Sequence, residues 1–208
     1  MSQILNMKEI FTEIYEKGHW QVHDKESVSG SGSTLQATIN TRKGIVDILK
    51  KYSIKSILDI ACGDFNWFKE IDLGDIKYIG GDIVETLIES NKKYETDLIT
   101  FEVLDITKSD LPEADLLICR DVFVHLSIED IELALKNIRG KYKYVLTTNF
   151  PTVENNREVE TGKWRILNVA LSPFNFPKAI ESIDEDRKGR EKGTEILHPK
   201  YLELFENI

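Results

Sequence analysis

Acidic side chains end two short apolar segments of the sequence, at Asp59 and at Asp82. Asp82 comes about 20 residues after the turn that follows the first segment, which is the spacing of an acid that hydrogen-bonds the hydroxyls of a ribose. A dinucleotide site would need G-x-G-x-x-G at that turn, so that the backbone can approach a pyrophosphate. Here a single glycine, Gly63, is followed by the acidic Asp64 and the bulky Phe65. NAD, FAD and ATP therefore fit poorly, and we expect a ribose-bearing cofactor without phosphates, of which S-adenosylmethionine is the commonest.

A second group of reactive side chains lies in the segment Cys119-Arg120-Asp121-Val122-Phe123-Val124-His125. A hydroxyl group that reacts as a nucleophile must lose its proton to a base such as a carboxylate or an imidazole. If a helical turn follows the preceding strand, Asp121 and His125 share one face. We therefore predict both as catalytic residues, with the alternative that His125 only packs. No catalytic metal is expected, because Asp121 is matched by Asn149 rather than by a second acid.

A polar segment late in the chain contains Trp164 between Lys163 and Arg165. An aromatic ring can stack on a sugar or another ring, and the two cations can hold an anionic group. The alternative is an ordinary solvated loop. Together with Trp20 and the glycine-rich stretch 27–33, this segment predicts a lid that excludes water. The predicted substrate-binding residues are Trp20, Asn149, Lys163, Trp164, Arg165 and Asn168.

Short apolar segments alternate with helical patterns through the middle of the chain. This alternation predicts a parallel sheet with helices on both faces, in which ligands bind beyond the carboxyl ends of the strands. The predicted strands are 56–60, 78–82, 99–103, 115–119 and 144–148, and the predicted helices are about 7–18, 35–52, 84–94 and 127–138. Segments 179–184 and 201–205 are expected to close the sheet as an antiparallel pair. The charged segment 186–193 between them is interpreted as a loop without a site.

These elements predict an α/β fold, a Rossmann-like, doubly wound and mostly parallel sheet of seven strands. The helices at the amino terminus do not belong to the alternation. We therefore divide the chain into an N-terminal helical lid, residues 1–53, and a cofactor-binding domain, residues 54–208.

The overall composition narrows the class of protein. The chain has 208 residues with 27 basic and 36 acidic side chains, a formal net charge of −9, which disfavours nucleic-acid binding. No run approaches the ~18 apolar residues of a membrane span, and the amino terminus lacks the pattern of a signal peptide. The two cysteines, Cys62 and Cys119, cannot build a disulfide framework. We expect a cytoplasmic protein that acts on a small molecule, without nucleic acid or membrane partners; the oligomeric state stays open.

The segment Leu58-Asp59-Ile60-Ala61-Cys62-Gly63-Asp64 resembles the first motif of class I S-adenosylmethionine-dependent methyltransferases, in which an acid is followed by G-x-G-x-G. Ala61 stands in place of the first glycine and Phe65 in place of the third. Ala61 is small, whereas Phe65 implies a different course of the chain after the turn. The resemblance covers about residues 54–150 and implies the seven-stranded sheet of this class.

Other positions of the chain are similar to further motifs of the same family. Asp82 corresponds to its ribose-binding acid, Asp105-Ile106 to the segment beside the adenine, and 115–126 to its fourth-strand motif. The resemblance implies S-adenosylmethionine as cofactor. The predicted cofactor-binding residues are Asp59, Ala61, Cys62, Gly63, Trp67, Asp82, Ile83, Asp105, Ile106 and Arg120.

The outer segments 29–33 and 162–168 resemble small bacterial methyltransferases associated with sugar and surface-polysaccharide (capsule) modification. This resemblance implies O-methylation of a small polar acceptor such as a sugar or sugar nucleotide in surface polysaccharide biosynthesis. Two alternatives remain open. One is an N-methyltransferase or a phosphate-type oxygen methyltransferase on a small metabolite, and the other is a cofactor-binding domain without catalysis.

Overall fold

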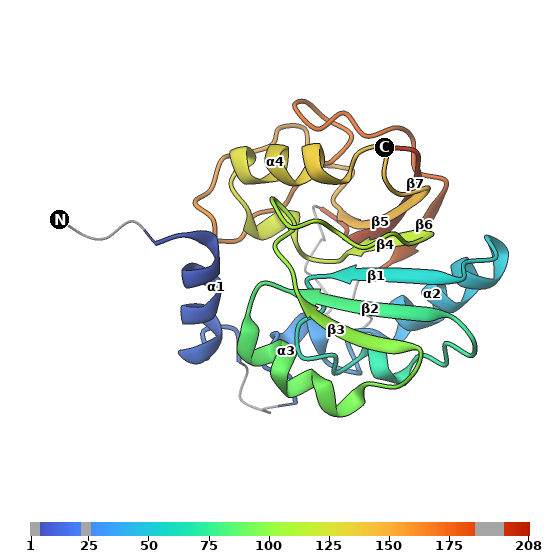
Figure 1. The fold of residues 1–208 in the computed structure, drawn as a ribbon. Coiled ribbons are helices and arrows are strands. Elements are labelled where there is room, and N and C mark those ends of the chain that lie inside the picture. Colours follow the sequence, from blue (N-terminus) through green and yellow to red (C-terminus); the bar gives the residue numbers. More distant parts are fainter. Residues whose placement is uncertain (1–4, 22–25, 186–197) are drawn as a thin grey trace.

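The computed structural model describes residues 5–21, 26–185 and 198–208. Seven strands form one sheet in the order β3-β2-β1-β4-β5-β7-β6 (Figure 1). The strands are β1 (Ser56–Ile60), β2 (Lys77–Asp82), β3 (Ile99–Val103), β4 (Leu116–Cys119), β5 (Tyr144–Asn149), β6 (Glu181–Asp184) and β7 (Tyr201–Glu206). The charged segment 186–193, predicted as a loop, lies outside the described residues.

The strand directions decide which residues meet at the cofactor edge of the sheet. Strands β1 to β5 are parallel, so their carboxyl ends lie at one edge. Strand β7 runs antiparallel to both β5 and β6, and its first residue, Tyr201, pairs with Asn149 at the end of β5 and with Asp184 at the end of β6. The residues next to these ends therefore lie at the same edge. The predicted α/β fold with a mostly parallel seven-stranded sheet is confirmed.

Successive strand residues face opposite sides of the sheet, and each side has its own hydrophobic core. On one side, Leu58 and Leu117 pack in a core that also holds buried residues of α1 (Met7–Glu16) and α4 (Ile128–Ile138). On the other side, Ile57 and Leu116 pack in the core of α2 (Ile39–Lys51). Helix α3 (Glu85–Asn91) contacts β2 and β3. Helices thus cover both faces, as the strand–helix alternation predicts.

Local sequence signals set the ends of the two helices on the first side. Asn6 caps α1 in a reciprocal pair with Glu9, each side chain accepting from the other residue's backbone N–H. Ser127 caps α4 by accepting from the Asp130 N–H at 3.1 Å. Helix α2 begins at Ile39, later than the predicted start near 35, because the Thr34 hydroxyl accepts from the Ala37 N–H and holds the preceding residues in a turn.

Helix α1 stands beside the sheet, near the carboxyl ends of the central strands (Figure 1). Its residues Met7, Phe11 and Tyr15 line a cavity together with residues that follow β1 and β4. The amino-terminal segment is therefore part of the site wall. In the part of the chain that the structure describes, no helix has the length and apolar character needed to cross a bilayer.

Candidate active site

A cavity of about 540 Å³ opens at the carboxyl ends of β1, β2 and β4. This volume is within the range of small-molecule sites, and the position is the one expected for ligands of an open parallel sheet. The predicted site residues that line it are Trp20, Asp59, Ala61, Cys62, Gly63, Trp67, Asp82, Ile83, Ile106, Arg120, Asp121, His125 and Trp164. The predicted residues Asp105, Asn149, Lys163, Arg165 and Asn168 are not part of its lining.

Asp82 holds the first turn of the site against the end of β2. One carboxylate oxygen accepts from the Gly63 N–H at 3.0 Å, and the other accepts from the Val84 N–H at 2.9 Å. Burial raises the pKa of the Asp82 carboxyl to about 6, and the backbone donors work against this effect. At neutral pH the group is a buried acceptor at the cavity wall, which is the chemistry that ribose hydroxyls require.

Asp59 lies behind this wall at the end of β1. Its carboxylate accepts from the Tyr78 hydroxyl at 2.8 Å. Burial raises the pKa of the Asp59 carboxyl to about 7, although the Tyr78 hydroxyl and the Arg120 charge oppose the rise. Both acids that the sequence predicts at the cofactor edge are therefore buried and face the cavity.

The turn after β1 is fixed by the serine-rich segment that precedes α2. The Asp64 carboxylate accepts from the Ser27 hydroxyl and from the Val28 N–H, both at 2.8 Å. In return, the Ser29 hydroxyl accepts from the Asp64 N–H at 3.0 Å and from the Tyr15 hydroxyl at 3.2 Å. This segment, which the sequence predicts as part of a lid, closes one side of the cavity.

Phe65 explains why the chain leaves the turn differently from the G-x-G-x-G pattern. The residue has a φ of 56° and is 2% exposed. Its ring packs against Tyr78 at 5.2 Å and Phe101 at 5.0 Å between ring centroids. The short 3-10 helix η2 (Phe68–Glu70) follows. The position of the third glycine is thus used for core packing.

Gly63→Ala is expected to weaken both the fold and cofactor binding. Gly63 has a φ of +60°, and an added Cβ would lie 2.4 Å from the Ser29 hydroxyl oxygen. The steric contact forces the serine segment away from the turn, and we expect a loss of about 1–3 kcal/mol in the free energy of unfolding. Gly74→Ala is the matched control, because Gly74 has a φ of +54° and no atom within 4 Å of an added Cβ. Denaturant unfolding of both variants measures the difference. Equal losses would show that backbone strain, and not the contact with Ser29, limits the position.

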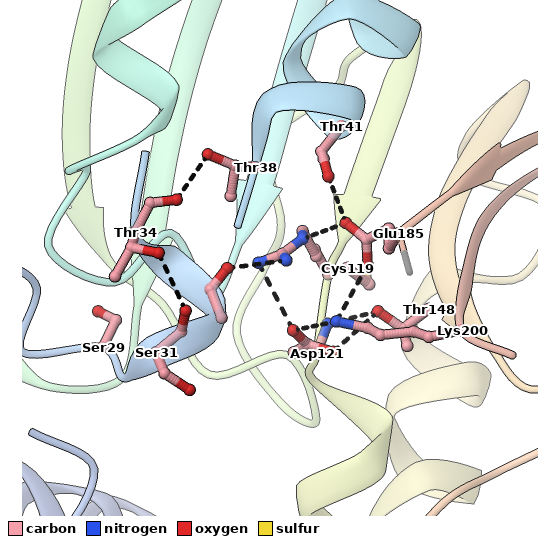
Figure 2. Close-up of polar contacts among 12 residues, drawn as sticks. Ser29, Ser31, Thr34, Thr38, Thr41, Cys119, Asp121, Thr148, Glu185 and Lys200 are labelled. Atoms are coloured by element: carbon pink, nitrogen blue, oxygen red, sulfur yellow. Dashed lines mark hydrogen bonds and ion pairs between the residues drawn. The ribbon is translucent and has the colours of Figure 1, made fainter. Parts of the chain in front are cut away.

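Four charged side chains form a closed ring beside the cavity (Figure 2). Arg120 pairs with Glu185 at 2.6 Å, Glu185 with Lys200 at 3.0 Å, Lys200 with Asp121 at 2.7 Å, and Asp121 with Arg120 at 3.5 Å. The Thr41 hydroxyl from α2 donates to Glu185 at 2.7 Å. We call these four residues the charged ring; its two cations and two anions balance, and all but Glu185 line the cavity.

The charged ring decides the protonation state of Asp121. Burial opposes ionisation, but the Lys200 ammonium and the Arg120 guanidinium outweigh it and hold the pKa of the Asp121 carboxyl well below its usual range. The Thr148 hydroxyl accepts from the Asp121 N–H at 2.8 Å and fixes the backbone there. Asp121 is thus a permanent carboxylate, suited to accept a hydrogen bond and poorly suited to take a proton at neutral pH.

Glu185 and Lys200 are the site residues that the sequence reasoning missed. They flank the segment between β6 and β7, and the Glu185 N–H donates to the Lys200 carbonyl at 3.0 Å. The antiparallel pair itself was the sequence signal, because it brings the end of β6 and the start of β7 to the carboxyl edge of the parallel strands.

Among the described residues, no cluster of three or more His, Cys, Asp or Glu side chains has the arrangement of a metal site.

His125 has the features of a base. Its Nδ1 lies 3.0 Å from the Lys163 carbonyl, which can only accept, so Nδ1 carries the proton and Nε2 bears the lone pair of the neutral ring. Its ring contacts Trp20, with the centroids 4.7 Å apart. Burial lowers the pKa of the imidazole, so the ring is neutral at pH 7.

Aromatic side chains form the wall around His125. Phe11 and Tyr15 of α1 pack on Trp20 at centroid distances of 6.0 and 5.4 Å. Elsewhere in the cavity lining, Phe150 contacts Trp164 edge-on at 6.4 Å, and Trp164 is 59% exposed. All five line the cavity. This part of the site suits a ring-shaped acceptor that stacks on aromatic faces.

Three of the predicted residues outside the cavity hold the backbone. Asn149 donates to Glu203 and accepts from the Val169 N–H, and Asn168 donates to the Pro151 and Val153 carbonyls. Asp105 accepts from the Thr107 N–H and hydroxyl. Their polar groups are used within the fold, which explains why they do not face the cavity.

The two cations predicted to hold an anionic acceptor have other positions. The Lys163 side chain is exposed and only its carbonyl touches His125. Arg165 is 5% exposed and its Nη1 donates to the Leu126 carbonyl at 2.5 Å. Of residues 163–165, only Trp164 lines the cavity.

Residues 58–143 match the family model described as a methyltransferase domain. No curated protein matches the chain at a significant level. Among solved structures, the N-methyltransferase NodS from Bradyrhizobium japonicum WM9, in complex with S-adenosyl-L-homocysteine, has a TM-score of 0.66 at 12% identity and is covered over 97% of its chain and 94% of this one.

Two further structures are similar. Magnesium protoporphyrin IX methyltransferase from Synechocystis PCC 6803, with bound S-adenosylmethionine, has a TM-score of 0.61 at 11% identity and covers 99% of this chain and 100% of its own. Human N-acetylserotonin methyltransferase, in complex with S-adenosylmethionine, has a TM-score of 0.60 at 16% identity and covers 98% of this chain and 60% of its own. At these identities the likeness shows the fold.

The chain thus has the class I methyltransferase fold, with a methyltransferase domain matched over residues 58–143. The methyl donor is S-adenosylmethionine. The residues present fit this molecule, because two buried carboxylates lie at the ends of β1 and β2 and the turn after β1 lacks the glycine pattern of a pyrophosphate site.

Proposed function

We propose that this protein methylates a hydroxyl of a small polar acceptor, a sugar or sugar nucleotide used in surface polysaccharide biosynthesis, in the cytoplasm. The observation that carries the proposal is the neutral imidazole of His125, packed on Trp20 in a cavity that Trp164 also lines. A pyranose ring can stack on an indole while one of its hydroxyls meets the imidazole. The balanced charged ring favours an acceptor group without a large net charge at the reacting end.

The cofactor would lie along the ends of β1 and β2. Asp82 would accept from the ribose hydroxyls, and Ile83 and Ile106 would contact the adenine, while Ala61, Cys62, Gly63 and Trp67 would form the wall along its length. When bound, S-adenosylmethionine supplies a methyl group that the sulfonium activates. Arg120, fixed by Glu185 and by the Gly32 carbonyl, would border the donor end.

The reaction that we propose for the acceptor is an in-line displacement. The acceptor oxygen forms a bond to the methyl carbon as the carbon–sulfur bond breaks, and the electron pair of that bond stays on sulfur as the neutral thioether. Nε2 of His125 takes the hydroxyl proton. Asp121, held as a carboxylate, orients the acceptor through a hydrogen bond. Helix α1 and Trp20, in the proposed lid of residues 1–53, exclude water from this step.

An acceptor panel tests the proposal. The protein would be incubated with S-adenosylmethionine and sugar nucleotides, free sugars, amines or phosphate monoesters, and mass spectrometry would detect methylated products. We expect hydroxyl methylation, and Trp164→Ala should raise the acceptor KM about 5-fold, because an aromatic stack is worth about 1 kcal/mol. Leu133→Ala is the control, since Leu133 is 45% exposed on α4 and lies outside the cavity lining. Methylation of amines alone would overturn the proposal, and cofactor binding without any product would indicate a non-catalytic domain.

A further inference from the structure

Residues 161–165, which we call the strap, hold the short 3-10 helix η4 (Phe123–His125) by backbone contacts. The Gly162 N–H donates to the His125 carbonyl at 2.8 Å, and the Arg165 N–H donates to the Val124 carbonyl at 3.0 Å. The Lys163 carbonyl accepts from Nδ1 of His125 at 3.0 Å. The Nη1 of Arg165 adds a bond to the Leu126 carbonyl, directly after η4. The orientation of the imidazole is therefore determined by the strap.

Arg165 is the unusual member of the strap. Its side chain is buried, yet Nε and Nη2 find no hydrogen-bond partner among the described residues. A buried guanidinium normally has a paired carboxylate, because leaving its charge uncompensated is costly. Glu158 is near enough to favour the charged form, but burial outweighs it and lowers the pKa of Arg165. The side chain remains a cation at neutral pH, since an arginine titrates far above it.

We propose that Arg165 is a positioning residue for His125, which holds the η4 turn through the Leu126 carbonyl and whose buried guanidinium disfavours a second positive charge on the imidazole. This inference rests on the proposed role of His125 as the base. It replaces the role in binding an anionic acceptor, which the burial of the guanidinium does not allow.

The groups around the imidazole allow the sign of the effect to be worked out. Burial and the two cations Lys200 and Arg165 lower the pKa of His125, whereas Asp121 and the Lys163 carbonyl raise it. Trp20, which packs on the ring, carries no charge. Lys200 is already paired with Asp121 and Glu185, so its field is partly cancelled. Arg165 forms no ion pair among the described residues and only Glu158 offsets its charge, so removing that charge should let His125 protonate at higher pH.

Histidine titration by NMR tests the proposal on the full chain with S-adenosyl-L-homocysteine as the added ligand. Arg165→Gln removes the charge but keeps a donor for the Leu126 carbonyl, and Arg165→Lys keeps the charge. We expect Arg165→Gln to raise the titration midpoint of His125 by about 0.5 pH units or more, a threefold or larger change in proton affinity. Arg165→Lys should stay near the wild-type midpoint. Lys163→Gln is the matched control, because it makes the same charge change on an exposed side chain of the strap.

The outcomes separate this inference from the proposed function. An unchanged midpoint in Arg165→Gln, or an equal shift in Lys163→Gln, would overturn it, as would an Arg165→Lys midpoint equal to that of Arg165→Gln. The ¹⁵N shifts of the ring would also show whether the proton stays on Nδ1, as the Lys163 carbonyl requires. The titration needs no acceptor and no turnover. The rate of His125→Gln decides separately whether His125 acts as the base.

Discussion

Replacing His125 by Gln is expected to lower the rate constant of methyl transfer by about 10²–10⁴-fold, the usual contribution of a general base. Glutamine keeps a polar group near the Lys163 carbonyl but cannot take the proton. Single-turnover rates at saturating cofactor, from pH 5.5 to 9, measure the effect. In the wild type, the rate should fall as acid protonates the imidazole, with a midpoint below ~6.5, because burial lowers the pKa of His125.

Asp121→Asn is the informative companion variant. Asp121 stays ionised throughout the assay range and raises the pKa of His125, so its loss should move the midpoint set by His125 to lower pH, while the rate drops through poorer orientation. If His125→Gln reacts at the wild-type rate with a flat pH profile, proximity alone accounts for catalysis. The hydroxyl acceptor would then lose its main support.

Asp82→Asn is expected to weaken binding of S-adenosyl-L-homocysteine by about 10–100-fold, since charge-assisted hydrogen bonds to two ribose hydroxyls contribute a few kcal/mol. Calorimetry measures the affinity, and Asp75→Asn, an exposed acid away from the cavity, is the control. Unchanged affinity in a folded Asp82→Asn protein would remove Asp82 from the ribose site.

The binding affinity measured by calorimetry should also depend on pH. Burial raises the pKa of Asp82 to about 6, so the carboxylate that accepts from the ribose is complete well above pH 6 and is lost below it. Wild-type affinity should therefore fall as the pH drops through this range, and the affinity of Asp82→Asn should show a weaker dependence. A wild-type affinity that stays constant from pH 7.5 to 5 would contradict the assigned role.

The sequence predicts well the features that are encoded by neighbouring residues. The short apolar strands and the acid that ends β2 are local signals, and the structure places each where it was expected. Phe65 is different, because a single residue does not reveal that four aromatic rings meet around it. Its role follows from packing between segments far apart in the sequence.

The parts of the site that were misjudged depend on long-range pairing. Arg165 and Asn168 have the chemistry of ligand-binding residues, but their partners are backbone carbonyls that only the folded chain brings near. Lys200 is not among the predicted site residues, yet it lies between Asp121 and Glu185. Polarity in a sequence thus predicts that a group needs a partner, and it does not say whether that partner is a ligand or the protein.

Helix α1 lies outside the matched methyltransferase segment, yet it contributes residues to the cavity. The methyltransferase segment spans 58–143, whereas the aromatic walls around His125 come from Phe11 and Trp20 before it and from Phe150 and Trp164 after it. In the proposed site, most contacts to the methyl donor therefore lie in one stretch of the chain, and the aromatic residues on the acceptor side lie in two others. We expect substitutions of these flanking aromatic residues to change the acceptor preference while the sheet and Asp82 are retained.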